Sequence, residues 1–254
     1  MALTYERTAD PLTIEPTYCG PPESAHGGVA VGRFATLVED GVAEVTLLGP
    51  PPLDTPLATR VEHDAVIVHG PAGDVARVRA HSGPMDVPAF DLVSEEELTA
   101  ASDQYLQAFG ETHTFPTCVG CGPDRRDPDA LRQFGADASD GDYVAGFSVP
   151  GSGRLPDWLT IAGLDCPSGA TVFGQVDEPP AAAVLGTMVV DRRGRAEAGV
   201  AYQVRGRLVA AEGRKLTSDV AMLDPDGSAV AVARAVWIIV DPAAFGAADG
   251  TAPT

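Results

Sequence analysis

Hydrophobic and polar residues alternate along nine segments of the chain, and this period of two is typical of strands with one buried face. The alternation is shorter in the first half and longer in the second, and a further short strand is expected at 12–18. The nine segments are 42–48, 57–62, 65–69, 74–81, 143–149, 182–191, 198–210, 215–223 and 229–240.

Three other segments place apolar residues at intervals of three and four, which predicts helices at 27–38, 94–109 and 155–174. The last is the most apolar. Asp157 is at its expected N-cap, and Pro167 is expected to break it just past Asp165. A carboxylate in so apolar a segment costs several kcal/mol unless it is hydrogen-bonded or used, so Asp165 is a functional candidate.

The order of strand, helix and four strands occurs twice, which indicates an internal duplication. Each copy ends similarly: residues 70–80 and 224–235 are both a tight turn that leads into an alternating strand. The expected division is a first unit at 12–83, a connector with a helix and a Cys-x-x-Cys loop at 84–141, and a second unit at 142–241. Each unit is α+β, with one helix on an antiparallel sheet.

The composition of the chain restricts which partners we expect it to bind and in which compartment we expect it. A net charge of −19 argues against nucleic acid or an anionic membrane surface as partner, and 44% hydrophobic residues suffice for a core. No apolar run reaches the ~18 residues of a membrane span, no signal pattern opens the chain, and four cysteines are too few for a secreted disulfide framework. We therefore expect a cytoplasmic protein. Arginine supplies every basic residue except Lys215, which is typical of a high-GC genome.

Two motifs carry a resemblance to a known family. The segment 25–29, Ala-His-Gly-Gly-Val at a helix start, is similar to the Gly-Gly that opens the helix of many hotdog thioesterases. The segment 163–167, Gly-Leu-Asp-Cys-Pro, is similar to the Leu-Asp-His segment of double-hotdog acyl-CoA thioesterases of type II. Residues 51–57 and 115–123 also resemble actinobacterial proteins of the thioesterase family.

The resemblance implies a double hotdog, in which two copies of a long helix are each wrapped by a curved antiparallel sheet. It implies hydrolysis of an acyl-CoA or acyl-carrier thioester without a cofactor, by a monomeric double hotdog or a homo-oligomer. It also assigns the catalytic carboxylate to Asp165. The family's Thr or Ser and its Gln are not recovered, since their positions fall near Val209 or Ala210 and near Arg234 or Ala235. Nearby residues that could substitute are Gln203, Thr217 and Ser218.

Thioester hydrolysis needs oxyanion donors, a carboxylate and a slot for the acyl chain. The backbone N–H groups of Gly27 and Gly28 are expected to stabilise the oxyanion, and Asp165 is the expected base or nucleophile, supported by Ser168 and His26. The acyl chain is expected to lie between the two helices, against Phe34, Trp158 and Ile161. Arg125 is the expected contact for a coenzyme A phosphate.

Each residue also has a structural alternative. Asp165 could be a cap bonded to backbone amides, and His26 a cap or loop residue. The glycines Gly27 and Gly28 could serve only to let two helices pack closely, and Ser168 could be a helix-turn hydroxyl. Arg125 could be a solvated surface residue.

The sequence Cys118-x-x-Cys121-Gly has the shape of a zinc knuckle, which His113 or Cys19 could complete. Since a second knuckle is absent, we expect a reduced or redox-sensitive pair and no metal.

Two rivals to the hydrolase remain. One is a non-catalytic acyl-thioester-binding protein, which the missing Thr and Gln favour. The other is a hotdog hydratase or dehydratase, in which His26 and Asp165 would form an acid–base pair across the two halves.

Overall fold

The computed structural model describes residues 12–39, 41–83, 85–127, 130–241 and 243. Within these residues, ten strands form one antiparallel sheet in the order β2-β3-β4-β1-β7-β10-β9-β8-β6-β5. The strands are β1 (Ala43–Leu47), β2 (Ala58–Glu62), β3 (Ala65–Gly70), β4 (Gly73–Ala80), β5 (Gly135–Asp137), β6 (Tyr143–Phe147), β7 (Ala183–Arg192), β8 (Tyr202–Glu212), β9 (Lys215–Leu223) and β10 (Ala229–Ile239).

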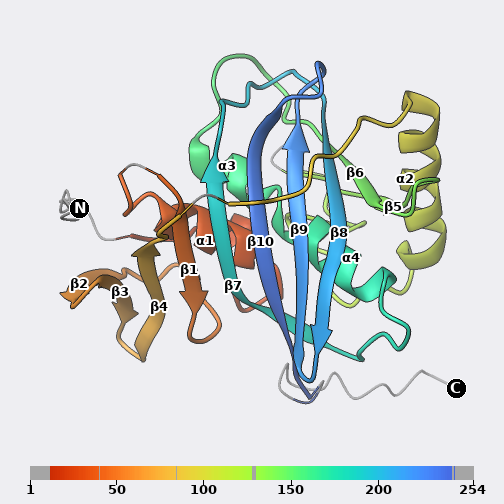
Figure 1. The fold of residues 1–254 in the computed structure, drawn as a ribbon. Coiled ribbons are helices and arrows are strands. Elements are labelled where there is room, and N and C mark those ends of the chain that lie inside the picture. The colour runs from red at the N-terminus through yellow and green to blue at the C-terminus, as the bar shows by residue number, and fades with distance from the viewer. Residues whose placement is uncertain (1–11, 40, 84, 128–129, 242, 244–254) are drawn as a thin grey trace, which may run out of the picture.

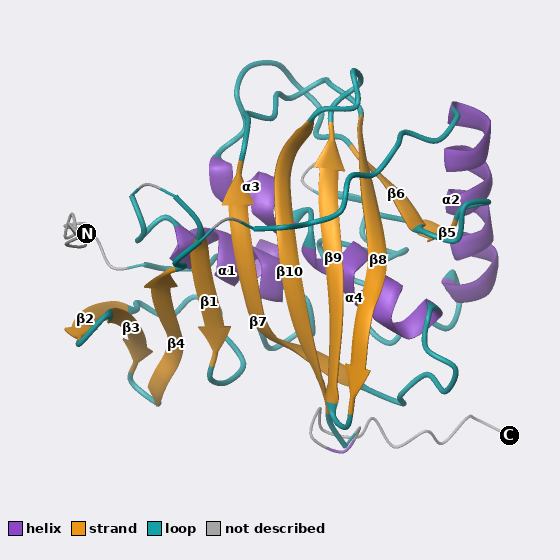
Figure 2. Cartoon of the chain, in the orientation of Figure 1, coloured by secondary structure: helices purple, strands orange, loops and turns teal. Residues whose placement is uncertain are grey.

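Helices lie against one face of this sheet and beside one of its edges (Figures 1 and 2). Three helices occupy the face, and the fourth packs beside β5 and β6 at the edge. On the face are α1 (Gly27–Ala35), α3 (Asp157–Ala162) and α4 (Asp165–Gly174), and at the edge is α2 (Glu95–Phe109). No helix among the described residues is both long and apolar enough to cross a membrane.

The two halves of the sheet share one strand order. Starting from the centre, the first half runs β1-β4-β3-β2, and the second runs β7-β10-β9-β8. The halves join where β1 pairs antiparallel with β7, with Ala43 opposite Val190. At this seam the hydroxyls of Thr46 and Thr187 lie 3.1 Å apart. The second half continues through β6 and β5, while on the other side Leu12 only bridges to Leu57.

The nine strands expected from alternation are confirmed, with bounds that differ by a few residues. The expected strand at 12–18 is wrong: Leu12 makes only its isolated bridge, and Pro16–Tyr18 is a 3₁₀ helix. Pro16 has no N–H to give to a ladder, which favours a helical start over a strand. The short strand β5 was not expected, because three residues are too few for a visible alternation.

The helix expected at 155–174 is two helices, and the break lies before Asp165 rather than after it. The chain turns at residues 163–164, between α3 and α4. Pro167 is the third residue of α4, where its missing N–H needs no partner, whereas in one continuous helix its ring would clash with the carbonyl of Gly163. At the other end Pro156 is the N-cap, and Asp157 is the first helical residue.

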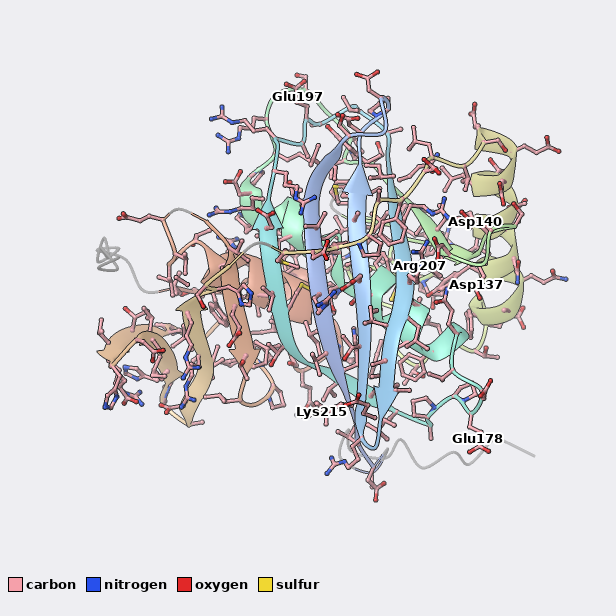
Figure 3. The ribbon with its side chains drawn as sticks, viewed as in Figure 1. Asp137, Asp140, Glu178, Glu197, Arg207 and Lys215 are labelled. Carbon is pink, nitrogen blue, oxygen red and sulfur yellow. The ribbon has the colours of Figure 1, made fainter. Side chains whose placement is uncertain are left out.

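Ion pairs join the edge of the second half to the segment that precedes β6. The guanidinium of Arg205, fully buried in β8, binds both carboxylate oxygens of Asp140 at 2.8 and 2.7 Å. Arg207 is paired with Asp142 through two hydrogen bonds. Figure 3 shows Asp140 and Arg207 on the side of the sheet near α2. These pairs fix the strands around α4, which carries Asp165.

Candidate functional site

Asp165 is the first residue of α4 and is 3% exposed. Its Oδ2 accepts a hydrogen bond of 2.5 Å from the N–H of Gly28, at the start of α1, and lies 3.4 Å from Nε2 of His26. Its Oδ1 is buried and has no hydrogen-bond partner. One carboxylate oxygen is therefore fixed across the two halves of the chain, and the other is available to a small polar molecule.

The two glycines at the start of α1 are required by the closeness of Asp165. A Cβ at Gly28 would lie 2.5 Å from Cβ of Asp165 and 2.8 Å from the carbonyl oxygen of Ala162. A Cβ at Gly27 would lie 3.1 Å from Oδ2 of Asp165. Any side chain at Gly28 would force α1 away from α3 and α4, so the bare backbone brings the N–H to the carboxylate.

His26 caps α1 and faces Asp165. Its Nδ1 accepts the N–H of Val29 at 3.3 Å, so the neutral ring carries its proton on Nε2. That Nε2 lies 3.1 Å from Sγ of Cys166, as well as close to Asp165. The imidazole is 2% exposed. His26 is thus a structural cap whose Nε2 lies close to both the Cys166 sulfur and the Asp165 carboxylate.

Burial disfavours the charged forms of Asp165 and His26, and the neighbouring charges favour them. Burial raises the pKa of Asp165, although His26 and the Gly28 N–H oppose the shift. Burial also lowers the pKa of His26, but the charges of Asp165 and Cys118 outweigh it and raise that pKa to about 9. The imidazolium is therefore favoured when both neighbours are ionised, at the cost of the long N-cap bond from Val29 N–H.

A cluster of sulfur atoms adjoins His26, and Cys166 is the member that the sequence analysis missed. Suitable ligand atoms of His26, Cys118 and Cys166 all lie within 4.8 Å of one another. Hydrogen bonds from Cys121 and Cys166 lower the pKa of the Cys118 thiol well below its ordinary value. Cys166 lies more than forty positions from the Cys-x-x-Cys pair, so spacing carries no sign of the cluster; only its place next to Asp165 could have suggested it.

Two predicted site residues bond elsewhere. The Ser168 hydroxyl donates to the main-chain oxygen of Asp165 at 2.7 Å and accepts the indole N–H of Trp237 at 3.0 Å, so it does not hold the carboxylate. Arg125 is buried rather than solvated, and its guanidinium contacts Thr17 at 2.7 Å and Asp127 at 2.8 Å.

The residues considered as substitutes for the family's Thr and Gln also have other partners. Ser218 donates to the carbonyl oxygen of Ser168 at 3.0 Å. Gln203 is bonded through its amide to both main-chain groups of Val93, in the connector. Thr217 pairs with Val236 in the ladder of β9 and β10. None of these contacts reaches Asp165.

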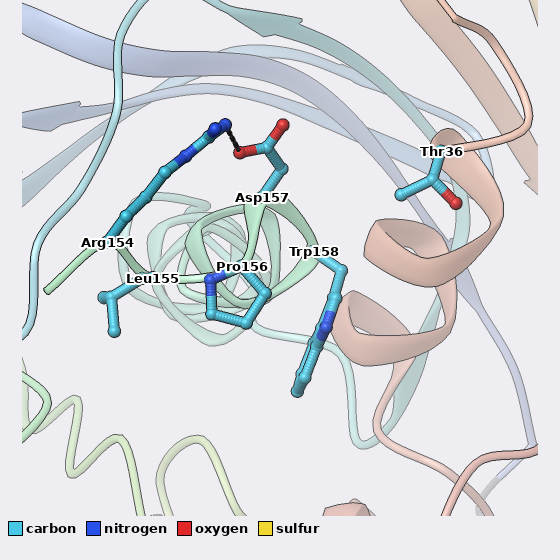
Figure 4. Close-up of a pocket in the computed structure, with 6 residues that line it drawn as sticks. All are labelled: Thr36, Arg154, Leu155, Pro156, Asp157 and Trp158. Carbon is cyan, nitrogen blue, oxygen red and sulfur yellow. Dashed lines mark hydrogen bonds and ion pairs between the residues drawn. The ribbon is translucent and has the colours of Figure 1, made fainter.

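The helices α1 and α3 touch through their backbones, which leaves no space for the expected acyl chain at that contact. A Cβ at Gly32 would lie 2.9 Å from Cα of Trp158, and both Phe34 and Ile161 are fully buried in the core. A shallow pocket of about 450 Å³ does lie against Trp158, but its other lining residues are Thr36 and residues 154–157 (Figure 4). It is therefore at the far end of the helix pair from Asp165.

No protein-family model matches the chain, and no curated protein matches its sequence. Solved structures match it over nearly its whole length. A conserved protein of unknown function with a hotdog fold from Alicyclobacillus acidocaldarius is 9% identical, with a TM-score of 0.60; the match covers 95% of this chain and 97% of that one. An acyl-CoA thioesterase II, TesB2, from Mycobacterium marinum is 14% identical with a TM-score of 0.53, over 91% and 92% of the two chains.

The dehydratase domain of a mycocerosic acid synthase-like polyketide synthase is also similar. It is 16% identical with a TM-score of 0.50, over 89% of this chain and 86% of that domain. At these identities the matches establish the architecture alone. Together with the strand order, they show that the chain has the hotdog fold.

Proposed function

We propose that the protein hydrolyses acyl thioesters, carried by coenzyme A or an acyl carrier protein, and that Asp165 is the catalytic carboxylate. One observation carries the proposal: a buried carboxylate is bound to a helix-start N–H at the meeting point of the two halves, with its second oxygen unpartnered. The similarity to an acyl-CoA thioesterase II supports the substrate class.

We further propose that the chain is a double hotdog, with units at 12–83 and 142–241 joined by the connector 84–141. The shared strand order of the two sheet halves supports this, as does the single seam between β1 and β7. A cytoplasmic location, and a monomeric or homo-oligomeric state, stay predictions.

In the proposed reaction, the ionised Asp165 removes a proton from a water at Oδ1, and the hydroxide attacks the thioester carbonyl carbon. The carbonyl oxygen becomes an oxyanion beside the start of α1, where the N–H groups of Gly27 and Gly28 and the positive end of the helix dipole stabilise it. The C–S bond then breaks, and the departing sulfur takes up the proton. For Gly28 to serve as oxyanion donor, its N–H must leave Oδ2 when substrate binds.

The substrate must also displace part of the cover over Asp165, whose side chain is only 5% exposed. The loop at Gly120 lies against Cys166 and His26, and it belongs to the connector rather than to the sheet. Gly27 and Cys166 are half-buried neighbours of the carboxylate. We therefore place the entry beside them, under the connector.

A second candidate function is hydration or dehydration of an acyl thioester. The observation in its favour is the 3.4 Å separation between His26 Nε2 and Asp165 Oδ2, two residues from different halves. The similarity to a polyketide synthase dehydratase domain points the same way. In this reaction His26 would exchange a proton with the substrate carbon, and Asp165 would exchange one with the hydroxyl oxygen.

One assay separates these candidates from a protein that only binds. Saturated and 2-enoyl-CoA substrates of short, medium and long chain are incubated with the protein, and free thiol release and loss of enoyl absorbance are followed together. Thiol release from a saturated substrate supports the hydrolase. Enoyl loss without thiol release, abolished in His26→Asn, supports the hydratase; asparagine keeps an N-cap acceptor for Val29 N–H. A raised melting temperature with no turnover leaves the binding protein and overturns both reactions.

A further inference from the structure

Three metal-ligating side chains from three separate segments, His26, Cys118 and Cys166, converge beside Asp165, and Cys121 lies three residues after Cys118. Cys118 and Cys121 come from the connector, Cys166 from the second position of α4, and His26 from the cap of α1. Sγ of Cys166 lies 3.1 Å from His26 Nε2, and Sγ of Cys118 lies within 4.8 Å of ligand atoms of both residues. All three cysteines are free thiols, and Cys118 and His26 are buried.

We propose that these four side chains bind one Zn²⁺ ion, with three thiolates and one imidazole nitrogen as ligands. The ligand atoms of His26, Cys118 and Cys166 already lie within 4.8 Å of one another, a separation suited to a tetrahedron with metal–ligand bonds of about 2.0–2.3 Å. Soft sulfur ligands with an imidazole are typical of structural zinc sites. Cys121, in the same loop as Cys118, supplies the fourth corner.

The loop that carries Cys118 and Cys121 is held in place by its backbone. The Gly122 N–H donates to the Cys118 carbonyl at 2.9 Å, which closes the Cys-x-x-Cys turn. The Val119 N–H donates to the carbonyl oxygen of Cys19 at 2.9 Å, and the Gln133 N–H donates to the carbonyl oxygen of Gly120 at 2.9 Å. The backbone of this loop is thus fixed by bonds that need no ion, and such preorganisation favours metal binding.

Gly120 lets this loop approach the other two ligands. A Cβ at Gly120 would lie 2.7 Å from Nε2 of His26, and it would overlap Sγ of Cys166. Only a residue without a side chain allows the sulfur atoms and the imidazole to reach a common centre. The same argument does not apply to Gly141 or Gly146, which have open space around them.

Zinc binding through His26 breaks one hydrogen bond, and zinc binding by the thiols releases protons. The ring must lose its Nε2 proton and carry one on Nδ1, so the 3.3 Å bond from Val29 N–H is lost. That bond is long, and its loss is correspondingly small. The three thiols release their protons as Zn–S bonds form, and no electrons are transferred.

The sequence pattern also offers His113 as a zinc ligand, but its position favours a hydrogen bond to a ligand sulfur instead. Its Nδ1 accepts Phe115 N–H at 3.0 Å, and its Nε2 lies 3.5 Å from Cys121 Sγ. It can thus donate a hydrogen bond to that sulfur, as groups around a metal centre do. Cys19 is directed away, with its Sγ bonded to the Thr117 carbonyl.

The experiment measures zinc in the full chain, produced with added zinc and purified under reducing conditions. Elemental analysis should give one zinc ion per chain, and Co²⁺ replacement should give the charge-transfer and d–d bands of a tetrahedral thiolate site. Cys118→Ser, Cys121→Ser and Cys166→Ser should each weaken affinity by at least about 10- to 100-fold, the loss typical even of outer-shell changes. Cys19→Ser, a buried cysteine outside the cluster, is the matched control and should retain zinc.

His26 is tested by the tautomer of its ring. Long-range ¹H–¹⁵N spectra should show a proton on Nδ1 alone in the zinc-loaded protein, whereas Nε2 should carry a proton after chelation. A ring that keeps Nε2–H with zinc bound removes His26 from the ligand set and overturns this part of the proposal.

The zinc site as a whole is overturned if the folded wild-type chain, produced with added zinc, contains no zinc and shows no Co²⁺ bands. This result does not depend on whether any cysteine variant folds. None of these measurements uses turnover, so the site can fail while the proposed hydrolysis stands, and the reverse also holds.

Discussion

The two halves of the sheet share a strand order but differ in their helices. In the first half α1 is one uninterrupted helix, and in the second half the corresponding segment breaks into α3 and α4. The strands differ as well: β1 to β4 have 5 to 8 residues, and β7 to β10 have 9 to 11. The break creates a new helix start at Asp165, and this start faces the start of α1 at Gly28. The candidate chemistry therefore gathers where the second half of the chain departs from the first.

The largest stability difference between the halves should come from their ion pairs. In the second half, Asp140→Asn leaves the fully buried Arg205 without its carboxylate, and we expect a loss of about 1.5–3 kcal/mol of unfolding free energy, the usual range for a hydrogen bond to a charged group. In the first half, Asp74→Asn breaks the exposed pair with Arg60 and should not shift the midpoint measurably. Urea unfolding of both variants measures the difference, and equal losses would contradict it.

The ion pair of Asp140 and Arg205 predicts that the free energy of unfolding depends on pH. Burial acts to raise the pKa of Asp140, but hydrogen bonds from Arg205 outweigh it and hold that pKa below its ordinary value. A carboxyl with a lowered pKa in the folded state stabilises the fold above its unfolded pKa, and this contribution is lost as the pH falls through the lowered value. The stability gap between wild type and Asp140→Asn should therefore be full at neutral pH and close in acid. A stability difference that does not change with pH would contradict a stabilising role for the charge of Asp140.

The contact between the halves is tested at Gly28. Gly28→Ala places a methyl group against the Asp165 side chain and the Ala162 carbonyl, and we expect overpacking to cost about 1–3 kcal/mol. Gly146→Ala, in β6, has no atom within 4 Å of the added carbon and is the matched control. Thermal unfolding should separate the two variants. A wild-type melting temperature in Gly28→Ala would mean that the two helix starts are not in contact.

The smallest effect is expected at the outer edge of the first half. Val61, in the edge strand β2, is 59% exposed, so Val61→Thr should change stability by no more than about 0.5 kcal/mol. Sedimentation of the same variant shows whether this strand contacts a second copy of the chain. A larger loss, together with dissociation, would show that the exposed face of β2 is covered in solution.

Most of the fold could be predicted from the sequence because its strands alternate. The alternation located nine of the ten strands, and it failed at β5, which has three residues. The break in the second helix was placed on the wrong side of Asp165, because a proline marks a helix boundary without saying whether it ends one helix or lies in the first turn of the next. The tertiary contact with α1 decides between the two, and no local pattern contains it.

The candidate site was predictable only in part, and for the same reason. His26, Gly28 and Asp165 were singled out from motifs, and the structure places them in contact. Cys166 was missed because its partners come from a different segment. The hydroxyl of Ser168 was assigned to the carboxylate from a three-residue spacing, but it turns back to the main chain, as serines inside helices often do.

The measurement that tests the central claim most directly is kcat/KM for thiol release, compared between Asp165→Asn and Asp157→Asn. Both changes remove one carboxylate at a helix start and keep the side-chain shape, but Asp157 lies at the far end of the helix pair and is bonded to Arg154 and Arg192. If Asp165 activates water, its variant should lose about 10²- to 10⁴-fold in kcat/KM while remaining folded, and the Asp157 variant should keep the wild-type rate. A folded Asp165→Asn protein that hydrolyses at the wild-type rate would contradict the account.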